Sequence, residues 1–144
     1  MTDADDLLML DNQLCFALVT AARNVVAIYR PILEPLGLTH PQYLVMLALW
    51  ERSPRALNDL ATDLALDPAT ASPLVKRLEA DGLVIRRRSA EDERRLDIDL
   101  TEAGSALREQ ALEVPARVMA AVGMDVTRVA ALRDALQPFA GRRA

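Results

Sequence analysis

The chain has one cysteine, Cys15, which is its single candidate nucleophile. A cysteine thiolate reacts with a peroxide to give a sulfenic acid, which a second thiol converts to a disulfide. With Asp11 as the expected N-cap, Cys15 follows the first turn of a helix, where the helix dipole favours the thiolate. Lone cysteines on helices are also commonly small buried apolar side chains. Cys15 is therefore a candidate redox site, with simple packing as the alternative.

Tyr29 shares a helix face with this cysteine, because Cys15, Ala22 and Tyr29 recur every seven residues. Over that separation a helix rises about 21 Å, so the cysteine and the tyrosine of one chain cannot touch. Antiparallel pairing of two such helices across a dimer axis would bring each Cys15 near the other chain's Tyr29. A site that uses both side chains must therefore lie between two subunits. Taken alone, Tyr29 is a helix residue with its hydroxyl toward water.

A second group of chemically useful residues is basic. Its charge could neutralise DNA phosphates, although the net charge of −4 argues mildly against a nucleic-acid partner. Acidic residues are concentrated elsewhere, in the N-terminal segment. The alternative is a solvated hairpin with internal ion pairs. The basic residues are Lys76, Arg77, Arg86, Arg87, Arg88, Arg94 and Arg95.

The elements around these residues favour DNA binding. Asn58 can cap a short helix over residues 59–65, and Asp67 with Pro68 opens a second helix that ends before Gly82. Residues 84–88 can form one strand, and residues 95–100 alternate apolar and polar side chains as a second strand, with a polar loop between the two. This order predicts a winged helix-turn-helix, a mainly α fold with a small β-hairpin wing. On the second helix, the residues available to a DNA groove are Thr70, Ser72, Lys76 and Arg77.

Helices are predicted on both sides of this lobe. One runs from Asp11 to at least Tyr29, where Pro31 bends or ends it, and a capping box at 39–42 opens another that continues to Glu51. After the ribbon, Thr101 is expected to cap a long helix that Pro115 kinks. Asp125 is expected to cap a final helix.

The chain is expected to form a single domain, residues 1–144, that dimerises through its terminal helices. Residues 58–100 make the DNA-reading lobe, and residues 7–35 and 101–144 supply dimerisation helices whose apolar faces the lobe is too small to cover. A two-fold dimer places two recognition helices about 34 Å apart, as a palindromic operator requires. The expected partners are therefore double-stranded DNA and a second copy of the chain.

Composition excludes several other classes. We expect that no apolar run is long enough to cross a membrane, and the acidic N-terminus is unlike a signal peptide, so we expect a cytoplasmic protein without a membrane partner. One cysteine and one histidine are too few for a zinc site. The sequence carries no cofactor motif, and we expect neither a metal nor a cofactor nor enzyme activity.

Four segments together resemble the MarR family of bacterial transcription regulators. The resemblance implies that the helix from Pro68 reads the major groove, and that Asp92 orients Arg94, whose guanidinium enters the minor groove. Residues Arg86, Arg87 and Arg88 would contact phosphates. The segments are residues 66–79, Asp81-Gly82-Leu83-Val84, Asp92-Glu93-Arg94-Arg95 and Leu100-Thr101-Glu102-Ala103-Gly104.

The N-terminal half is similar to a narrower group, the OhrR-type organic-hydroperoxide sensors. The similarity covers residues 11–18, 29–31 and 36–46. It implies that Cys15 is the sensing thiol and that side chains at positions 29 and 40 hydrogen-bond to it across the dimer. The chain departs from the group at His40, where a tyrosine is usual, and at Val19, where an aromatic residue is common. Without a second cysteine, it resembles the branch in which a low-molecular-weight thiol caps the oxidised cysteine.

The resulting hypothesis is a homodimeric repressor that leaves a palindromic operator when an organic hydroperoxide oxidises Cys15. One rival keeps the DNA-binding module but makes a small aromatic or phenolic acid the effector, bound between the dimer helices and the lobe. A second rival is a one-cysteine peroxidase with Cys15 as its nucleophile. A third makes the helix-turn-helix a protein-contact module and predicts no preference among DNA sequences.

Overall fold

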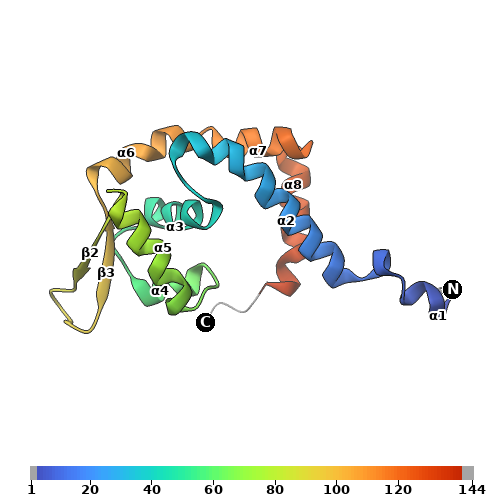
Figure 1. Cartoon of the computed structure of the whole chain (residues 1–144), viewed down its shortest axis with the longest axis horizontal. Helices are drawn as coiled ribbons and strands as arrows, with labels where there is room; N and C mark the ends of the chain where they lie inside the picture. Colours follow the sequence, from blue (N-terminus) through green and yellow to red (C-terminus); the bar gives the residue numbers. More distant parts are fainter. Residues whose placement is uncertain (1–2, 141–144) are drawn as a thin grey trace.

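The computed structural model describes residues 3–140, and the chain forms a lobe with a β wing beside a bundle of terminal helices (Figure 1). The N-terminal part contains α1 (Ala4–Leu7), η1 (Leu10–Asn12), α2 (Leu14–Leu33), η2 (Glu34–Leu36) and α3 (His40–Glu51). The middle contains β1 (Arg55–Ala56), α4 (Leu57–Asp63), α5 (Pro68–Ala80), β2 (Val84–Arg88) and β3 (Leu96–Leu100). The C-terminal part contains α6 (Glu102–Ala111), α7 (Val114–Val122), α8 (Val126–Leu136) and η3 (Gln137–Phe139).

The recognition helix α5 has the bounds that the sequence predicts. Pro68 is its first residue, and Gly82 follows it with a φ of 79°. Gly82 donates its N–H to the carbonyl of Glu79 at 3.0 Å, and Leu83 donates to the carbonyl of Leu78 at 3.0 Å. These two bonds satisfy carbonyls at the helix end as in a Schellman motif, which needs a left-handed residue at this position.

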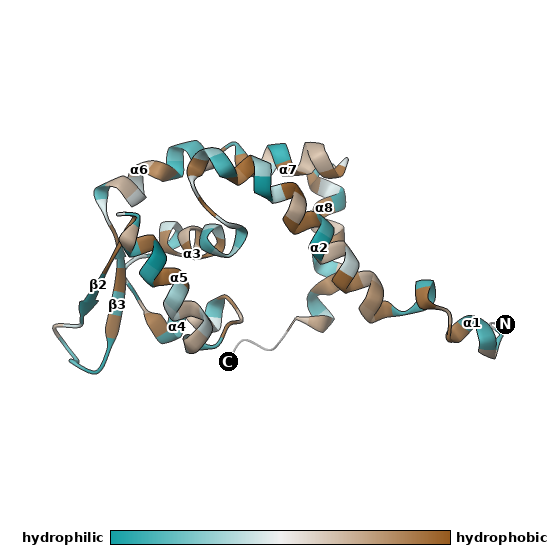
Figure 2. Cartoon of the chain, viewed as in Figure 1, coloured by the Kyte–Doolittle hydropathy of each residue, from teal (hydrophilic) through white to brown (hydrophobic). Residues whose placement is uncertain are grey.

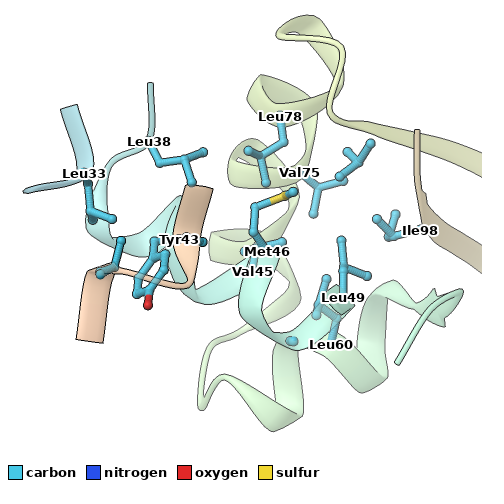
Figure 3. Packing of buried hydrophobic residues seen from close by; sticks show 14 of the residues in the cluster. Leu33, Leu38, Tyr43, Val45, Met46, Leu49, Leu60, Val75, Leu78 and Ile98 are labelled. Carbon is cyan, nitrogen blue, oxygen red and sulfur yellow. The ribbon is translucent and has the colours of Figure 1, made fainter. Parts of the chain in front are cut away.

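The core is built around α3, which lies between the lobe and the terminal helices. Its buried residues pack against side chains from α4, α5 and β3 (Figure 3). Burial of these apolar side chains drives the assembly of the lobe. The side chains with exposures of 1% or less include Leu33, Val45, Met46, Leu49, Leu60, Val75, Leu78 and Ile98.

The wing is a three-stranded sheet and not the predicted two-stranded ribbon. Its order is β1-β3-β2, with both pairings antiparallel. Strand β1 has two residues, too short for a period of two to be visible in the sequence. It is held by Arg55, which is 6% exposed and donates to Asp63 of α4 at 2.5 Å and to the carbonyl of Arg52 at 2.9 Å.

Two predicted caps in the helix-turn-helix were wrong in detail. Helix α4 begins at Leu57, with Ala56 in the cap position, so Asn58 lies inside the first turn. Asp67 does occupy the cap position of α5, but its side chain accepts no capping hydrogen bond. By contrast, Thr39 and Gln42 form both bonds of the predicted capping box at the start of α3.

The first long helix begins later than predicted and ends later. Residues 10–12 form the separate turn η1, and Gln13, not Asp11, is the N-cap residue of α2. Pro31 lies inside α2, which continues to Leu33. A proline removes one backbone hydrogen bond, and here the last turn forms despite that loss. Cys15 is therefore the second residue of its helix.

The predicted long helix after the ribbon is two helices. Thr101 caps α6 as expected, accepting from the N–H of Gly104 at 3.0 Å. The helix stops at Ala111, and Pro115 lies in the first turn of the next helix, α7. Proline has no N–H for the carbonyl four residues earlier, which is that of Ala111, so the break falls where the kink was expected. Asp125 caps α8 as predicted, accepting from the N–H of Arg128 at 2.9 Å.

Helix α2 and the segment before it expose an apolar surface (Figure 2). Residues Leu14–Leu36 form a stretch of 23 residues that is long and apolar enough to cross a membrane by length and composition alone, so the sequence-based exclusion of such a run was wrong. Arg23 and Arg30 lie within this stretch. In this chain only Leu33 of α2 is fully buried, so most of the helix surface is left for another molecule to cover.

Candidate nucleic-acid interface and redox site

Helix α5 presents a polar face opposite its buried one. Ala71, Val75 and Leu78 are fully buried against the core, at the three- and four-residue spacing of one helix face. Thr70, Lys76 and Arg77 are exposed, while Ser72 is half-buried. Arg77 Nε lies 3.6 Å from Asp81 Oδ2, one helical turn further along the chain. The predicted groove-facing residues are thus all placed on the solvent side of the recognition helix or at its edge.

The wing tip brings Asp92 and Arg94 together. The N–H of Arg94 donates to Asp92 Oδ1 at 3.0 Å, and Arg94 Nε lies 3.8 Å from the same oxygen. The side chain of Arg94 is 96% exposed. An exposed arginine with one carboxylate beside it is free to exchange that weak contact for a DNA groove.

Arginines nearer the root of the wing are engaged within the protein. Arg86 Nε donates to Glu79 at 2.9 Å, and Glu79 also accepts the backbone N–H of Arg86 at 2.9 Å. The backbone hydrogen bond, and then the guanidinium, hold the pKa of Glu79 below its usual value. Arg87 pairs with Asp99 at 3.1 Å. This pattern matches part of the alternative prediction, a hairpin with internal ion pairs.

Other cations of the interface have no such partner. Within the part of the chain that the structure describes, Lys76 and Arg88 are exposed and form no ion pair. Arg95, in contrast, donates to Asp97 at 2.8 Å, which raises the pKa of Arg95 further. The cations with the greatest freedom to meet DNA are therefore Lys76, Arg88 and Arg94, whereas DNA contacts of Arg86 and Arg87 stay predictions.

Cys15 and Tyr29 lie far apart in the chain, as helix geometry requires. Both belong to α2, and Cys15 is exposed near its start. Tyr29 instead joins a cluster of rings, with its centroid 4.7 Å from that of His40 and 5.9 Å from that of Tyr43. Tyr43 is 3% exposed and belongs to the core, as expected. One chain thus brings Tyr29 and His40 together and leaves Cys15 about 21 Å away.

Burial sets the charge state of this ring cluster. It lowers the pKa of His40 below its usual value of 6.5, so the imidazole is neutral at pH 7. Burial also raises the pKa of Tyr29 and, together with the neighbouring Tyr29, that of Tyr43. A neutral histidine can donate or accept a hydrogen bond but supplies no positive charge.

A cavity of about 810 Å³ lies between α2, the start of α3 and the end of α5. Its lining includes Arg30, His40 and Arg77 together with the apolar Val26 and Leu38. Glu34 and Asp81 also line it, and Arg77 lies 3.6 Å from Asp81. Among the described residues, Arg30 is the lining arginine that forms no ion pair, and it could meet the carboxylate of a small organic acid. Among residues 3–140, no group of three His, Cys, Asp or Glu side chains could hold a metal ion.

Gly104 is a residue whose role could not be predicted from the sequence, although it lies within one of the segments that resemble the MarR family. A Cβ at this position would overlap the carbonyl oxygen of Leu83 and would lie 3.0 Å from its carbonyl carbon. The carbonyl of Gly104 also accepts from Trp50 Nε1 at 2.9 Å. A glycine in the first turn of a helix disfavours that helix, and this cost is the signal that could have indicated a close contact.

Glu79 is the second residue that was missed. It lies on α5 and binds both the backbone and the side chain of Arg86 on β2, so it fixes the root of the wing to the recognition helix. In the sequence it is one acidic residue on a charged helix face, and nothing local distinguishes it from a solvated side chain.

An α-helix with a free polar face, next to a β hairpin with an exposed arginine tip, defines a winged helix-turn-helix DNA-binding protein. Comparison with known proteins gives the family. The family described as transcriptional regulator SarA/Rot matches residues 27–110. The organic hydroperoxide resistance transcriptional regulator of Bacillus subtilis (strain 168) is 41% identical over 119 residues, which are 83% of this chain and 81% of that protein.

Comparison with solved structures supports the same family. Reduced AbfR bound to DNA is 41% identical with a TM-score of 0.69, over 73% of each chain, and AbfR comes from Staphylococcus epidermidis. CouR from Rhodococcus jostii RHA1, bound to p-coumaroyl-CoA, is 30% identical with a TM-score of 0.74, over 92% of this chain and 94% of CouR. This chain belongs to the MarR/SarA family of winged-helix regulators and is a DNA-binding transcription regulator.

Proposed function

We propose that the protein is a homodimeric repressor whose operator binding is switched off when an organic hydroperoxide oxidises Cys15. The observation that carries this proposal is the separation, along α2, of an exposed thiol at Cys15 from Tyr29, whose ring packs on that of His40 at the start of α3. Antiparallel pairing of α2 with its copy places each thiol against the other subunit's cluster. The relative in Bacillus subtilis that is named for organic hydroperoxide resistance supports this assignment.

Dimer formation has a physical basis in the exposed apolar surface. Large apolar side chains on the terminal helices remain 38–68% exposed, among them Leu14, Phe16, Val126 and Leu136. Soluble proteins seldom leave so large an apolar area in water. A two-fold partner covers this surface and sets two recognition helices at the spacing of a palindromic operator. A protein of this class acts where DNA is, in the cytoplasm.

The proposed chemistry is stoichiometric and balanced. The Cys15 thiolate attacks the outer oxygen of the hydroperoxide, an S–O bond forms, the O–O bond breaks, and the alkoxide leaves as the alcohol after it takes a proton. Sulfur is oxidised and the peroxide is reduced. A low-molecular-weight thiol then displaces water from the sulfenic acid and leaves a mixed disulfide. The added bulk at the dimer interface changes the spacing of the two wings. The protein is a sensor and not a peroxidase, so it consumes one peroxide per subunit.

The test compares wild type with Cys15→Ser on a labelled duplex from the gene's own upstream region. Both reduced proteins should bind, and stoichiometric hydroperoxide with a small thiol should release the wild type alone. Release of both proteins would show that the effector acts elsewhere. Peroxide consumption over many turnovers would instead establish an enzyme. A duplex of scrambled sequence tests the alternative in which the helix-turn-helix contacts proteins, because that alternative predicts equal binding to both duplexes.

The neutral His40 gives a second prediction. We expect His40 to hydrogen-bond to the partner's Cys15, so His40→Ala should slow oxidation of Cys15 by roughly tenfold, the worth of one hydrogen bond to a charged group. His40→Tyr, which keeps a donor, should retain most of the rate. Stopped-flow oxidation measures this directly, and operator binding by the reduced variants serves as the control for folding. Equal rates for all three proteins would remove His40 from the site.

A second candidate function is favoured by the cavity of about 810 Å³. An aromatic acid bound there would contact Arg77 on the recognition helix and could change its position. The cited neighbour CouR was solved with p-coumaroyl-CoA. In this case Cys15→Ser would leave induction intact, and an acid ligand would release DNA without any oxidant.

A further inference from the structure

An apolar groove of about 280 Å³ lies between α3 and the junction of α6 with α7. Its floor is formed by Tyr43, Leu47 and Trp50 along one side of α3, and its opposite wall by Leu112 and Pro115. Leu47 remains 40% exposed and Leu112 54% exposed. An apolar groove with two leucines in water is a surface that another apolar segment can cover.

The segment before α2, residues 4–13, carries apolar side chains that could cover such a surface. This N-terminal arm extends away from the body of the molecule (Figure 1). Its shape is fixed by polar side chains, since Gln13 Nε2 donates to the carbonyls of Leu7 and Met9 at 2.8 Å each. Its apolar side chains nevertheless stay in water, with Leu7 61%, Leu8 84% and Leu10 62% exposed. The arm is ordered without a surface to pack on.

Position and length connect the arm of one subunit to the groove of the other. In the proposed dimer, Cys15 of one subunit lies against the partner's Tyr29, and the ring of Tyr29 is 5.9 Å from that of Tyr43 at the end of the groove. The arm therefore starts where the groove begins. The floor from Tyr43 to Trp50 spans about 10 Å along α3. The ten residues of the arm, in α1, the extended Met9 and η1, are enough to follow it.

The charges of the groove and of the arm also favour the arm as the segment that occupies the groove. Two charged side chains line the groove, Glu51 and Arg108. Glu51 lies 3.8 Å from Arg55, whereas Arg108 forms no ion pair with any residue from 3 to 140. The arm carries Asp5 and Asp6 in α1 and no basic residue, whereas α8 carries Arg128 and Arg133 with one acidic residue, Asp134. An acidic and apolar segment complements a groove whose free charge is positive.

We propose that the N-terminal arm of each subunit docks in the α3/α6–α7 groove of its partner and covers the Cys15 site. The inference rests on the proposed dimer and thiol site, and it adds their regulation: the partner's arm controls which reagents reach the thiol. A small hydroperoxide enters beside the arm, whereas a bulky electrophile needs the arm to leave. When the arm undocks, its leucines are exposed to water again, so the docked arrangement has the lower free energy.

Directed crosslinking tests the docking. Cys15→Ser removes the only cysteine of the chain, and Leu8→Cys with Leu47→Cys then places one thiol on the arm and one in the groove. Mild oxidation should give a covalent dimer on a non-reducing gel. The matched pair Leu132→Cys with Leu47→Cys moves the first thiol to α8 and should stay uncrosslinked. Crosslinking by this pair instead, or by Leu8→Cys alone, would overturn the assignment.

A second measurement separates this inference from the proposed function. In chains that retain Cys15, Leu8→Asp should raise the rate of Cys15 alkylation by a bulky maleimide about tenfold, since burial of one leucine is worth roughly that factor in an equilibrium. Ile85→Asp, at an exposed apolar position on the wing, should leave the rate unchanged. If sedimentation shows a dimer but neither a crosslink nor a change in the Cys15 alkylation rate is found, only the docking of the arm is refuted. A monomer refutes the dimer as well, and oxidant release of Cys15→Ser refutes the thiol switch.

Discussion

Gly104→Ala is expected to lower the free energy of unfolding by about 3 kcal/mol, at the upper end for overpacked sites. The added Cβ would overlap the backbone carbonyl of Leu83, which cannot rotate away as a flexible side chain would. That carbonyl already accepts the N–H of Thr101 at 3.1 Å. Either α6 moves away from the loop before β2, or the bond between Trp50 and Gly104 breaks. Chemical denaturation of the reduced protein measures the loss.

The control for this substitution is Ser105→Ala on the same turn of α6. Ser105 is exposed, and alanine favours helix, so its stability should change little. The Gly104→Ala protein should also show altered Trp50 fluorescence, because a shift of α6 and a break of the bond both disturb the contact between the indole N–H and the Gly104 carbonyl. Equal stability of the two variants would mean that α6 has room beside Leu83.

The recognition helix could be predicted from sequence because its boundaries depend on local chemistry. Pro68 fixes the backbone angle of the first helical position, and Gly82 permits the left-handed angle after the last. The same holds for Thr39, Thr101 and Asp125, whose side chains accept the expected capping bonds. A cap is a contact within four residues, so sequence alone contains both partners.

Long-range contacts are what the sequence could not supply. Strand β1 exists because Arg55 and Ala56 meet β3, more than forty residues along the chain, with Arg55 opposite Ile98. Glu79 binds Arg86 only because the turn at Gly82 brings β2 back beside α5. Cys15 was placed in the right helix, but the start of that helix depends on the turn η1, whose side-chain bonds have no standard spacing. The roles of the candidate site residues stay predictions, and the long-range contacts that support these residues could not be predicted from the sequence.

Arg94→Ala is expected to weaken operator binding about a hundredfold, because a dimer loses two groove contacts and each is worth roughly tenfold. The free energy of unfolding should not change, since the guanidinium is 96% exposed and its contact with Asp92 is 3.8 Å long. Fluorescence anisotropy with the upstream duplex measures the affinity. Glu93→Ala, at the neighbouring exposed position, is the matched control and should not weaken binding.

Salt dependence then distinguishes the two kinds of wing arginine. Arg88→Ala should lower the slope of log affinity against log salt by about 2 for a dimer, since each subunit loses one phosphate contact, and it should weaken all sequences alike. Arg94→Ala should also reduce the preference for the operator over a scrambled duplex, because groove width depends on sequence. Arg86→Ala should act differently again. It removes the side-chain bond to Glu79 and leaves only the backbone bond, so it loosens β2 from α5 and weakens binding while the slope changes less. If Arg94→Ala lowered the affinity equally for operator and scrambled duplexes, the wing tip would contact only phosphates and would not recognise the shape of a groove.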